Sequence, residues 1–373
     1  MDTPYHCLKR INLFLLLLFL VLPGITQAEK VEGWQDVIRN TPYWMSQGVA
    51  GNLETLRRWV LLGKAYCEQP NRHILYNRRG AFLTWMEDAE SPEETQKAID
   101  RTRETLAQED RATFWLAGGL ERIGYPFALA CDQPHVDIGA SIDRLLGRAT
   151  DSRVWGTWDD LAIGSPDQKV PLLTLFEKIY EDRQAKGRYT FPKSILGLLL
   201  GQVIIESGVQ KNAQSAAAAQ GIMQLRPEVL SDCQIPKRLH YHRMVQIDCA
   251  YRLLEQNHRN LRGPFEARFG HLPPEKREAL YLRLLLQAYH GGIGRVLALI
   301  GSDDTGNAAR YFAQHQENFS ARDIALGLIF HNLGRLQLGF ASLYYATDVE
   351  IAAQAMCQSM AHREPHWCSE PDS

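Results

Sequence analysis

Three segments of the chain each begin with a proline, continue as an apolar stripe and end with a glycine. They span residues 171–187, 192–208 and 274–291. Proline fits the first turn of an α-helix, because the N–H group that it lacks has no partner there, and glycine favours the left-handed backbone that ends many helices. The apolar residues recur every three or four positions, which places them on one helical face. These segments predict a fold built mainly from packed helices.

Other helix signals are spread over the rest of the chain. Helix starts are predicted at a capping box beginning with Ser91, at Ser320 and at Thr347, and a helix end at Gly63. No long alternating strand pattern occurs, although residues 73–85 could form a short hairpin. We therefore assign the chain to the all-α class.

Turn-forming residues cluster near positions 165–170 and suggest a domain boundary. We expect a mainly helical N-terminal region at 29–168, a second domain at 169–346, and a C-terminal helix and tail at 347–373. The N-terminal region is rich in Trp and Tyr. Such rings can stack on sugars, but they more often belong to a core, so the role of this region stays open.

The first 28 residues are typical of a secretory signal peptide. Lys9 and Arg10 precede an apolar run at 11–22, and small residues at 26–28 offer a cleavage site. The run is shorter than the roughly 20 residues that a membrane span needs, although an uncleaved anchor is the alternative. The protein is therefore expected in the periplasm or outside the cell.

Six cysteines remain after Cys7 leaves with the signal peptide, and an even number in an exported chain permits disulfides. The plausible pairs are Cys67 with Cys131, Cys233 with Cys249, and Cys357 with Cys368, although the sequence alone does not determine the connectivity. A zinc site is the alternative at the C-terminal end, where the candidate ligands are Cys357, His362, His366 and Cys368.

The chain carries a formal net charge of −2, with both signs interspersed and no basic stripe. Nucleic acid is therefore an unlikely class of partner.

An acidic residue stands at the end of the second helical segment. Glu206 follows Val203, Ile204 and Ile205, so we expect apolar surroundings for it. Burial and the C-terminal end of a helix both disfavour a charged carboxylate, and a neutral carboxyl group can donate a proton to a leaving oxygen. These arguments make Glu206 suitable as an acid without identifying it, because a Glu at a helix end is usually just solvated.

A longer pattern follows. The positions that carry it are Glu206, Ser207, Ala213, Ser215, Ala217, Ala219, Gly221, Ile222, Met223, Gln224, Leu225 and Pro227, with a second segment Ala288-Tyr289-His290-Gly291. Together they resemble the catalytic region of soluble lytic transglycosylases, enzymes of the lysozyme superfamily, over about residues 190–300. The resemblance implies a lysozyme-like helical domain in the C-terminal half, acting on the glycan strands of peptidoglycan.

The resemblance also implies roles for single residues. Glu206 would be the catalytic acid and then the base, Ser215 would hydrogen-bond near the reacting centre, and Gln224 and Tyr289 would line the sugar cleft. The predicted substrate-binding residues are thus Ser215, Gln224, Tyr289, Met223 and Ser207. Neutral donors and acceptors of this kind suit hydroxyl and acetamido groups.

The sequence departs from the family pattern at residues 209–211, loosely matches it at 246–253, and differs at three single positions. His290 stands where Asn usually follows the Tyr, Ala218 replaces a Gly, and Arg226 replaces an apolar residue. The departures indicate a divergent member. Imidazole titrates near neutrality, so His290 could add a pH dependence or simply be packed.

The resemblance implies a mechanism with one acid and without a metal or organic cofactor. Glu206 would protonate the leaving oxygen and then take the proton of the sugar's own 6-hydroxyl, which closes a 1,6-anhydro ring. A second carboxylate would instead signal hydrolysis, and Glu228, Asp232 and Asp248 are candidates by proximity in sequence.

Two other functions stay open. One is a hydrolase of the same fold, similar to goose-type lysozymes or chitinases. The other is a glycan-binding or scaffold protein with a decayed site. In each case the N-terminal region could contact other cell-envelope proteins, and the sequence does not indicate an oligomeric state.

Overall fold

The computed structural model describes residues 32–132, 136–360 and 365–368. The described residues belong to one compact unit that extends from Glu32. The predicted signal peptide lies outside them. None of the helices in the described part of the chain has the length and apolar character needed to span a lipid bilayer.

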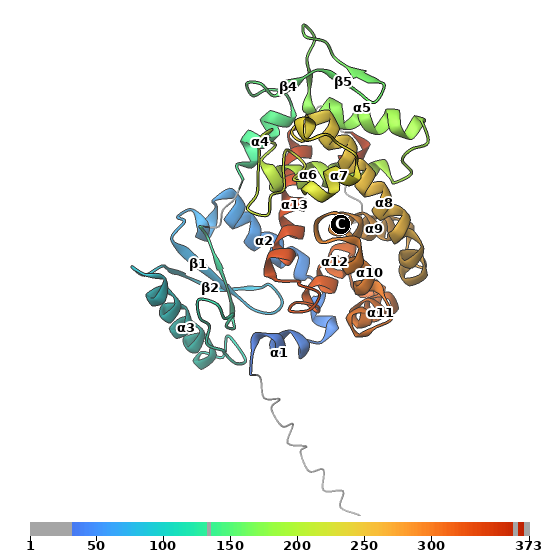
Figure 1. Ribbon diagram of the computed structural model, residues 1–373. Helices are drawn as coiled ribbons and strands as arrows, with labels where there is room; N and C mark the ends of the chain where they lie inside the picture. The colour runs from blue at the N-terminus through green and yellow to red at the C-terminus, as the bar shows by residue number, and fades with distance from the viewer. Residues whose placement is uncertain (1–31, 133–135, 361–364, 369–373) are drawn as a thin grey trace, which may run out of the picture. The chain divides into compact units, whose positions relative to one another are not determined.

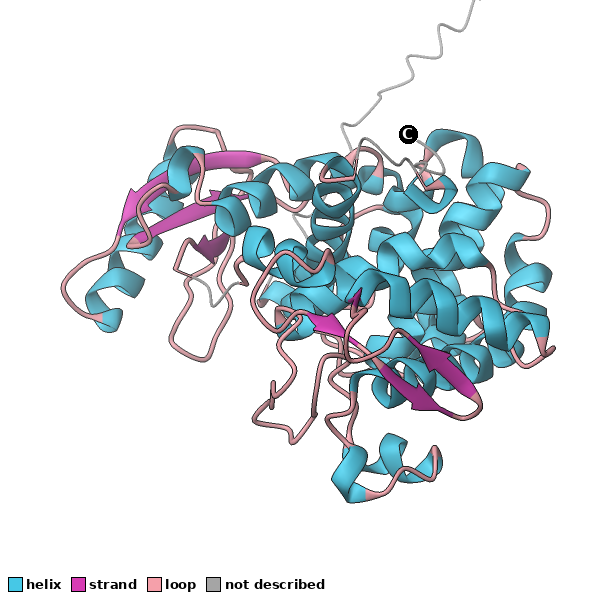
Figure 2. Cartoon of the chain, turned by 90° about the horizontal axis from the view of Figure 1, so that it is seen from above, coloured by secondary structure: helices cyan, strands magenta, loops and turns pink. Residues whose placement is uncertain are grey.

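Helices dominate these residues, and strands are short (Figures 1 and 2). The α-helices are α1 (Trp34–Arg39), α2 (Val49–Leu62), α3 (Pro92–Gln108), α4 (Ile138–Leu145), α5 (Leu172–Ala185), α6 (Leu196–Ser207), α7 (Pro227–Asp232), α8 (Arg243–Phe269), α9 (Pro274–Gly291), α10 (Ile293–Ile300), α11 (Asn307–Gln314), α12 (Ala321–Phe330) and α13 (Phe340–Gln358). The strands are β1 (Arg72–Tyr76), β2 (Phe82–Glu87), β3 (Phe127–Ala130), β4 (Arg153–Val154), β5 (Gly156–Trp158), β6 (Leu161–Ile163) and β7 (Val170–Pro171). The prediction of a largely helical fold is confirmed.

Most of the predicted helix boundaries are confirmed. The hydroxyl group of Ser91 accepts a hydrogen bond from the N–H of Glu94 at the start of α3, and Ser320 caps α12 in the same way. Gly63 ends α2 and Gly208 ends α6, both in the left-handed conformation. Local sequence chemistry is enough to predict such ends, because each cap involves neighbours in the chain.

The helix start predicted at Thr347 is wrong. Helix α13 begins at Phe340, so Thr347 lies inside it, where its hydroxyl group donates to the Leu343 carbonyl one turn earlier. A threonine can cap a helix or bond back along one, and the sequence pattern does not distinguish the two.

A three-stranded antiparallel sheet in the order β2-β1-β3 forms part of the N-terminal region. The predicted hairpin is confirmed as β1 and β2, with Ile74 opposite Trp85 and a bulge after Leu75. The pairing of β1 with β3 was not predicted. Helix α3 covers this sheet through a small core of Leu75 and Leu106.

Three disulfides join the predicted pairs, Cys67–Cys131, Cys233–Cys249 and Cys357–Cys368. The Cys357–Cys368 disulfide rules out the zinc site suggested at the C-terminal end, because its two candidate cysteine ligands are bonded to each other. His362 lies outside the described residues. Within those residues, no group of three His, Cys, Asp or Glu is placed to hold a metal ion.

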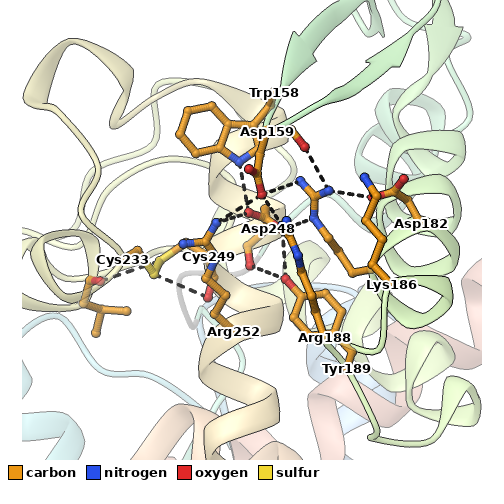
Figure 3. A network of polar contacts seen from close by, with 12 residues as sticks. Trp158, Asp159, Asp182, Lys186, Arg188, Tyr189, Cys233, Asp248, Cys249 and Arg252 are labelled. Carbon is orange, nitrogen blue, oxygen red and sulfur yellow. Dashed lines mark hydrogen bonds and ion pairs between the residues drawn. A yellow bond between two sulfur atoms is a disulfide. The ribbon is translucent and has the colours of Figure 1, made fainter.

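A buried carboxylate, Asp248 of α8, ties together three parts of the second half of the chain (Figure 3). It accepts hydrogen bonds from Trp158 of β5 at 3.0 Å and from Tyr189, which follows α5, at 2.8 Å. Arg183 of α5, fully buried, lies 3.0 Å from it, and Arg252 lies 2.8 Å from it. The network therefore fixes α5 and the β5–β6 hairpin against α8.

We expect the substitution Asp248→Asn to lower the free energy of unfolding by about 2 kcal/mol at pH 7, because it removes the buried one of the three charged partners of Arg183 and leaves only Asp159 and Asp182. Burial alone would raise the pKa of Asp248, but the Trp158 hydrogen bond and the charge of Arg252 bring it below its usual value. The ionised group thus stabilises the fold above its unfolded pKa of about 3.9, and this contribution is lost as the pH falls further.

Urea unfolding at several pH values between 7 and 3 measures this effect, and the curves of parent and variant should converge toward the acid end. The matched control is Asp232→Asn, which changes an exposed acid on α7. It should shift stability by no more than about 0.5 kcal/mol. An equal loss at pH 7 and pH 3 for Asp248→Asn would contradict the ionic explanation.

Candidate active site

Glu206 lies in the last turn of α6, where Val203 and Ile204 are buried in the core and Ile205 is partly buried. Its side chain keeps 22% of its surface exposed, so it is neither sealed in nor out in bulk solvent. Gly208 then ends the helix with φ of 58°. The carboxyl group therefore stands at an apolar helix end with limited access to solvent, as predicted.

Two side chains from distant parts of the chain reach one oxygen of this carboxyl group. The Tyr345 hydroxyl of α13 donates to Oε1 at 2.8 Å, and Nδ1 of His290, at the end of α9, lies 3.4 Å from the same oxygen. The imidazole ring stacks on the Tyr345 ring with 3.7 Å between centroids and 17° between planes. Among the described residues, none forms a hydrogen bond or ion pair with Oε2.

This one-sided arrangement has a chemical consequence. Burial, and then the charge of Glu206, raises the pKa of Tyr345 well above its usual value, so its hydroxyl group stays protonated and donates at any working pH. A neutral carboxyl group has one accepting oxygen and one O–H group. With Oε1 held as the acceptor, Oε2 is the oxygen on which the proton of the neutral form would lie.

The segment after α6 folds back as a tight turn next to this acid. Ser207 is buried, and its hydroxyl group donates to the Ile222 carbonyl at 2.8 Å, which joins the helix end to the turn. Gly221 has φ of 71°, and a side chain there would collide with Gln246 at 2.6 Å. The amide of Gln246 accepts the N–H of Met223 at 3.1 Å. Glycine is thus required for both conformation and space.

Two predicted substrate-binding residues stabilise this turn. The hydroxyl group of Ser215 accepts the N–H of Ala219 at 3.1 Å, and the Gln224 amide donates to the Gly221 carbonyl at 2.9 Å. Both side chains are partly exposed. The hydrogen bonds that they make to described residues stay within the turn, and neither joins them to Glu206.

Tyr289 connects α9 to the same turn. Its hydroxyl group donates to the Met223 carbonyl at 3.1 Å, while the Met223 side chain is buried. Burial of this hydroxyl group, and the charge of Glu206, raise the pKa of Tyr289 well above its usual value. The structure thus brings Glu206, Ser207, Met223 and Tyr289 together, with Ser215 and Gln224 farther along the turn.

Tyr345 was not predicted as a site residue. It lies 56 positions beyond Tyr289, in a helix whose start was placed after it, and no local motif surrounds it. Its spacing from Val349, which shares its core cluster, is a helical signal that could have placed it on a buried face. Contact with Glu206 could not have been inferred from that spacing.

The structure gives little support to Asp248, Glu228 or Asp232 as the second carboxylate that hydrolysis would need. Asp248 is 1% exposed, and its oxygens are taken up by the network described above. Glu228 and Asp232 are exposed on α7. A cavity of about 570 Å³ beside Arg188, Arg252 and Arg259 is lined by none of the predicted site residues.

The site thus combines a half-buried carboxyl group, held by a phenol and an imidazole, with a glycine-dependent turn. Residues 183–312 match the family model of the transglycosylase SLT domain, so the chain contains an SLT-type, lysozyme-like domain, as the motifs predicted. No curated protein matches the chain. The matched range includes Glu206 and His290 but ends before Tyr345.

An SLT domain indicates lytic transglycosylase activity on peptidoglycan, and hence a place of action outside the cytoplasm.

We expect Tyr345→Phe to lower kcat by about 10- to 100-fold, because an active-site acid displaced by even about 1 Å can lose that much. The ring stays in place against His290, so KM should change little. Steady-state rates on purified glycan strands measure the effect, and thermal unfolding shows whether the fold is kept. A variant with the parent's kcat would mean that the hydroxyl group does not position Glu206.

Proposed function

We propose that the protein is a peptidoglycan lytic transglycosylase that cleaves the β-1,4 bond between N-acetylmuramic acid and N-acetylglucosamine and leaves 1,6-anhydro-N-acetylmuramic acid ends. The observation that carries the proposal is Glu206, with Oε1 held by Tyr345 and Oε2 free, inside a transglycosylase SLT domain.

The reaction needs two proton transfers by the same group. Glu206 first donates its proton from Oε2 to the glycosidic oxygen, so the bond to the anomeric carbon breaks, and the substrate's acetamido group stabilises the positive sugar. The carboxylate then takes the proton of the 6-hydroxyl, whose oxygen attacks the anomeric carbon and closes the ring. The acid is thereby restored. Neither step needs a second carboxylate, a metal ion or an organic cofactor.

The other predicted residues would contribute to substrate binding in two ways, by direct contact with the sugar or by fixing the turn. We propose that Ser215, Gln224 and Tyr289, which are partly exposed, contact sugar hydroxyl and acetamido groups. Ser207 and Met223 are buried, and we propose that they contribute to substrate binding by fixing the turn that presents those groups. Gln224 would have to turn from the Gly221 carbonyl when a sugar binds.

We further propose that residues 1–28 are a signal peptide and that the mature protein works in the periplasm or outside the cell. The three disulfides are compatible with such an oxidising compartment. Residues 29–168 and 169–346 remain our proposed N-terminal region and catalytic domain, followed by a C-terminal helix and tail at 347–373.

Mass spectrometry of purified cell wall digested by the mature protein tests the proposal. Anhydro ends are the expected result. Products with reducing ends would show a hydrolase of the same fold instead. If the protein binds wall but releases no fragments, it is a glycan-binding protein and the proposal is wrong.

A further inference from the structure

Helix α13 lies between the acid site and the N-terminal region and contacts both. It packs against α6, which carries Glu206, and against α2 of the N-terminal region (Figure 1). On the α6 side, Tyr345 and Val349 join a core with Leu286. Any rotation or shift of α13 would therefore move the Tyr345 hydroxyl group relative to Glu206.

The residue next to Tyr345 is held from the opposite side. The hydroxyl groups of Tyr344 and Tyr76 of β1 are hydrogen-bonded to each other, and Tyr76 is buried. The guanidinium group of Arg57, from α2, lies over the Tyr344 ring at 4.9 Å. Adjacent residues of one helix thus reach two different partners, the acid on one side and the N-terminal region on the other.

Arg57 also forms a buried ion pair one turn farther along α13. Its Nε and Nη2 atoms each lie 2.7 Å from an oxygen of Asp348, and its side chain is 4% exposed. A two-point pair of this kind fixes orientation as well as distance, because the guanidinium and carboxylate planes must align. Burial protects it from competition by water and salt.

We propose that the N-terminal region positions the catalytic acid through α13, and that Arg57 and Tyr76, the α13 anchor, are positioning residues for Glu206 although they do not touch it. The inference rests on the proposed function, because it takes Glu206 as the acid. It gives the N-terminal region a role within the active site.

Two variants loosen the α13 anchor without leaving a buried charge. Tyr76→Phe removes one hydroxyl group, and the pair Arg57→Met with Asp348→Leu replaces the ion pair by apolar side chains of similar size, a change that folded proteins often tolerate. On purified glycan strands we expect kcat to fall about tenfold, with KM nearly unchanged. Hydrogen exchange should become faster along residues 340–358.

The decisive measurement repeats both changes in a Tyr345→Phe background. If the α13 anchor acts only through the Tyr345 hydroxyl group, loosening it should not lower kcat further in the Tyr345→Phe protein, because that protein lacks the hydroxyl group. A general loss of stability would instead lower activity equally in both backgrounds. Equal losses, or an unchanged kcat in the parent background, would overturn the inference. If the double change prevents folding, Tyr76→Phe alone decides between these outcomes.

Arg103→Met is the matched control. Arg103 is another buried arginine of the N-terminal region, but its partners are Asp100 and the Pro126 carbonyl, within that region. This variant should be less stable and keep the parent's kcat. Glu206→Gln distinguishes failure of the proposed function from failure of the inference about α13. If Glu206→Gln is active, the proposed function is wrong. If Glu206→Gln is inactive but the anchor variants keep the parent's kcat, only the inference about α13 is wrong.

Discussion

The Glu206→Gln variant should solubilise peptidoglycan at least about 1,000-fold more slowly than the parent, because a positioned general acid contributes about 10²- to 10⁴-fold and the amide can neither donate nor reclaim the proton. Gln has nearly the same shape, and its carbonyl oxygen can still accept the Tyr345 hydrogen bond. The fold and the affinity for wall should therefore persist. Release of soluble fragments measures the rate, and sedimentation with insoluble wall measures binding.

Glu228→Gln is the control for this prediction. Glu228 is exposed on α7, directly after the motif, so the same chemical change there should leave the rate unaltered. If Glu206→Gln releases fragments as fast as the parent, a single-acid mechanism through this residue is excluded. If it loses activity because it no longer binds wall, Glu206 is a binding residue and not the acid.

The elements that could be predicted from the sequence are those whose signals are local. Helices α3, α5, α9 and α12 begin at capping residues or prolines that act on their own first turn. The sheet shows the limit, because the β1–β2 hairpin closes within a few residues whereas β3 pairs with β1 across 51 to 57 positions. Only the β1–β2 hairpin can therefore be predicted from the pattern of neighbouring residues.

The candidate site divides in the same way. The glycine-dependent turn carries a recognisable spacing, because its contacts with the end of α6 and within itself lie within about 20 positions of one another. Tyr345 and the α13 anchor were missed because their contacts span well over 100 positions and involve residue types that are common in any core. Asp248, one of three possible second carboxylates by proximity, is a structural ion-pair centre whose partners besides Arg252 lie 59 to 90 positions away.

The helix contact that sets Tyr345 against Glu206 depends on a glycine, and its substitution should have the largest effect on the fold. A Cβ at Gly201 of α6 would lie 2.3 Å from the Val349 carbonyl oxygen and 2.8 Å from the Ala353 N–H nitrogen. Both atoms belong to the α13 backbone, so neither can turn aside as a flexible side chain would. We expect Gly201→Ala to lower the free energy of unfolding by about 3 kcal/mol, and by more if the helices cannot separate.

Gly51→Ala is the matched control, since this exposed glycine lies in α2 with no atom within 4 Å of the added Cβ. Alanine has the higher helix propensity, so this variant should gain up to about 1 kcal/mol. Urea unfolding of both proteins measures the contrast. Separation of α6 and α13 should also lengthen the Tyr345–Glu206 hydrogen bond, so any Gly201→Ala protein that still folds should show a reduced kcat. A Gly201→Ala protein as stable as the parent would mean that the two helices do not meet as closely as described, and the route from the N-terminal region to the acid would then lose its physical basis.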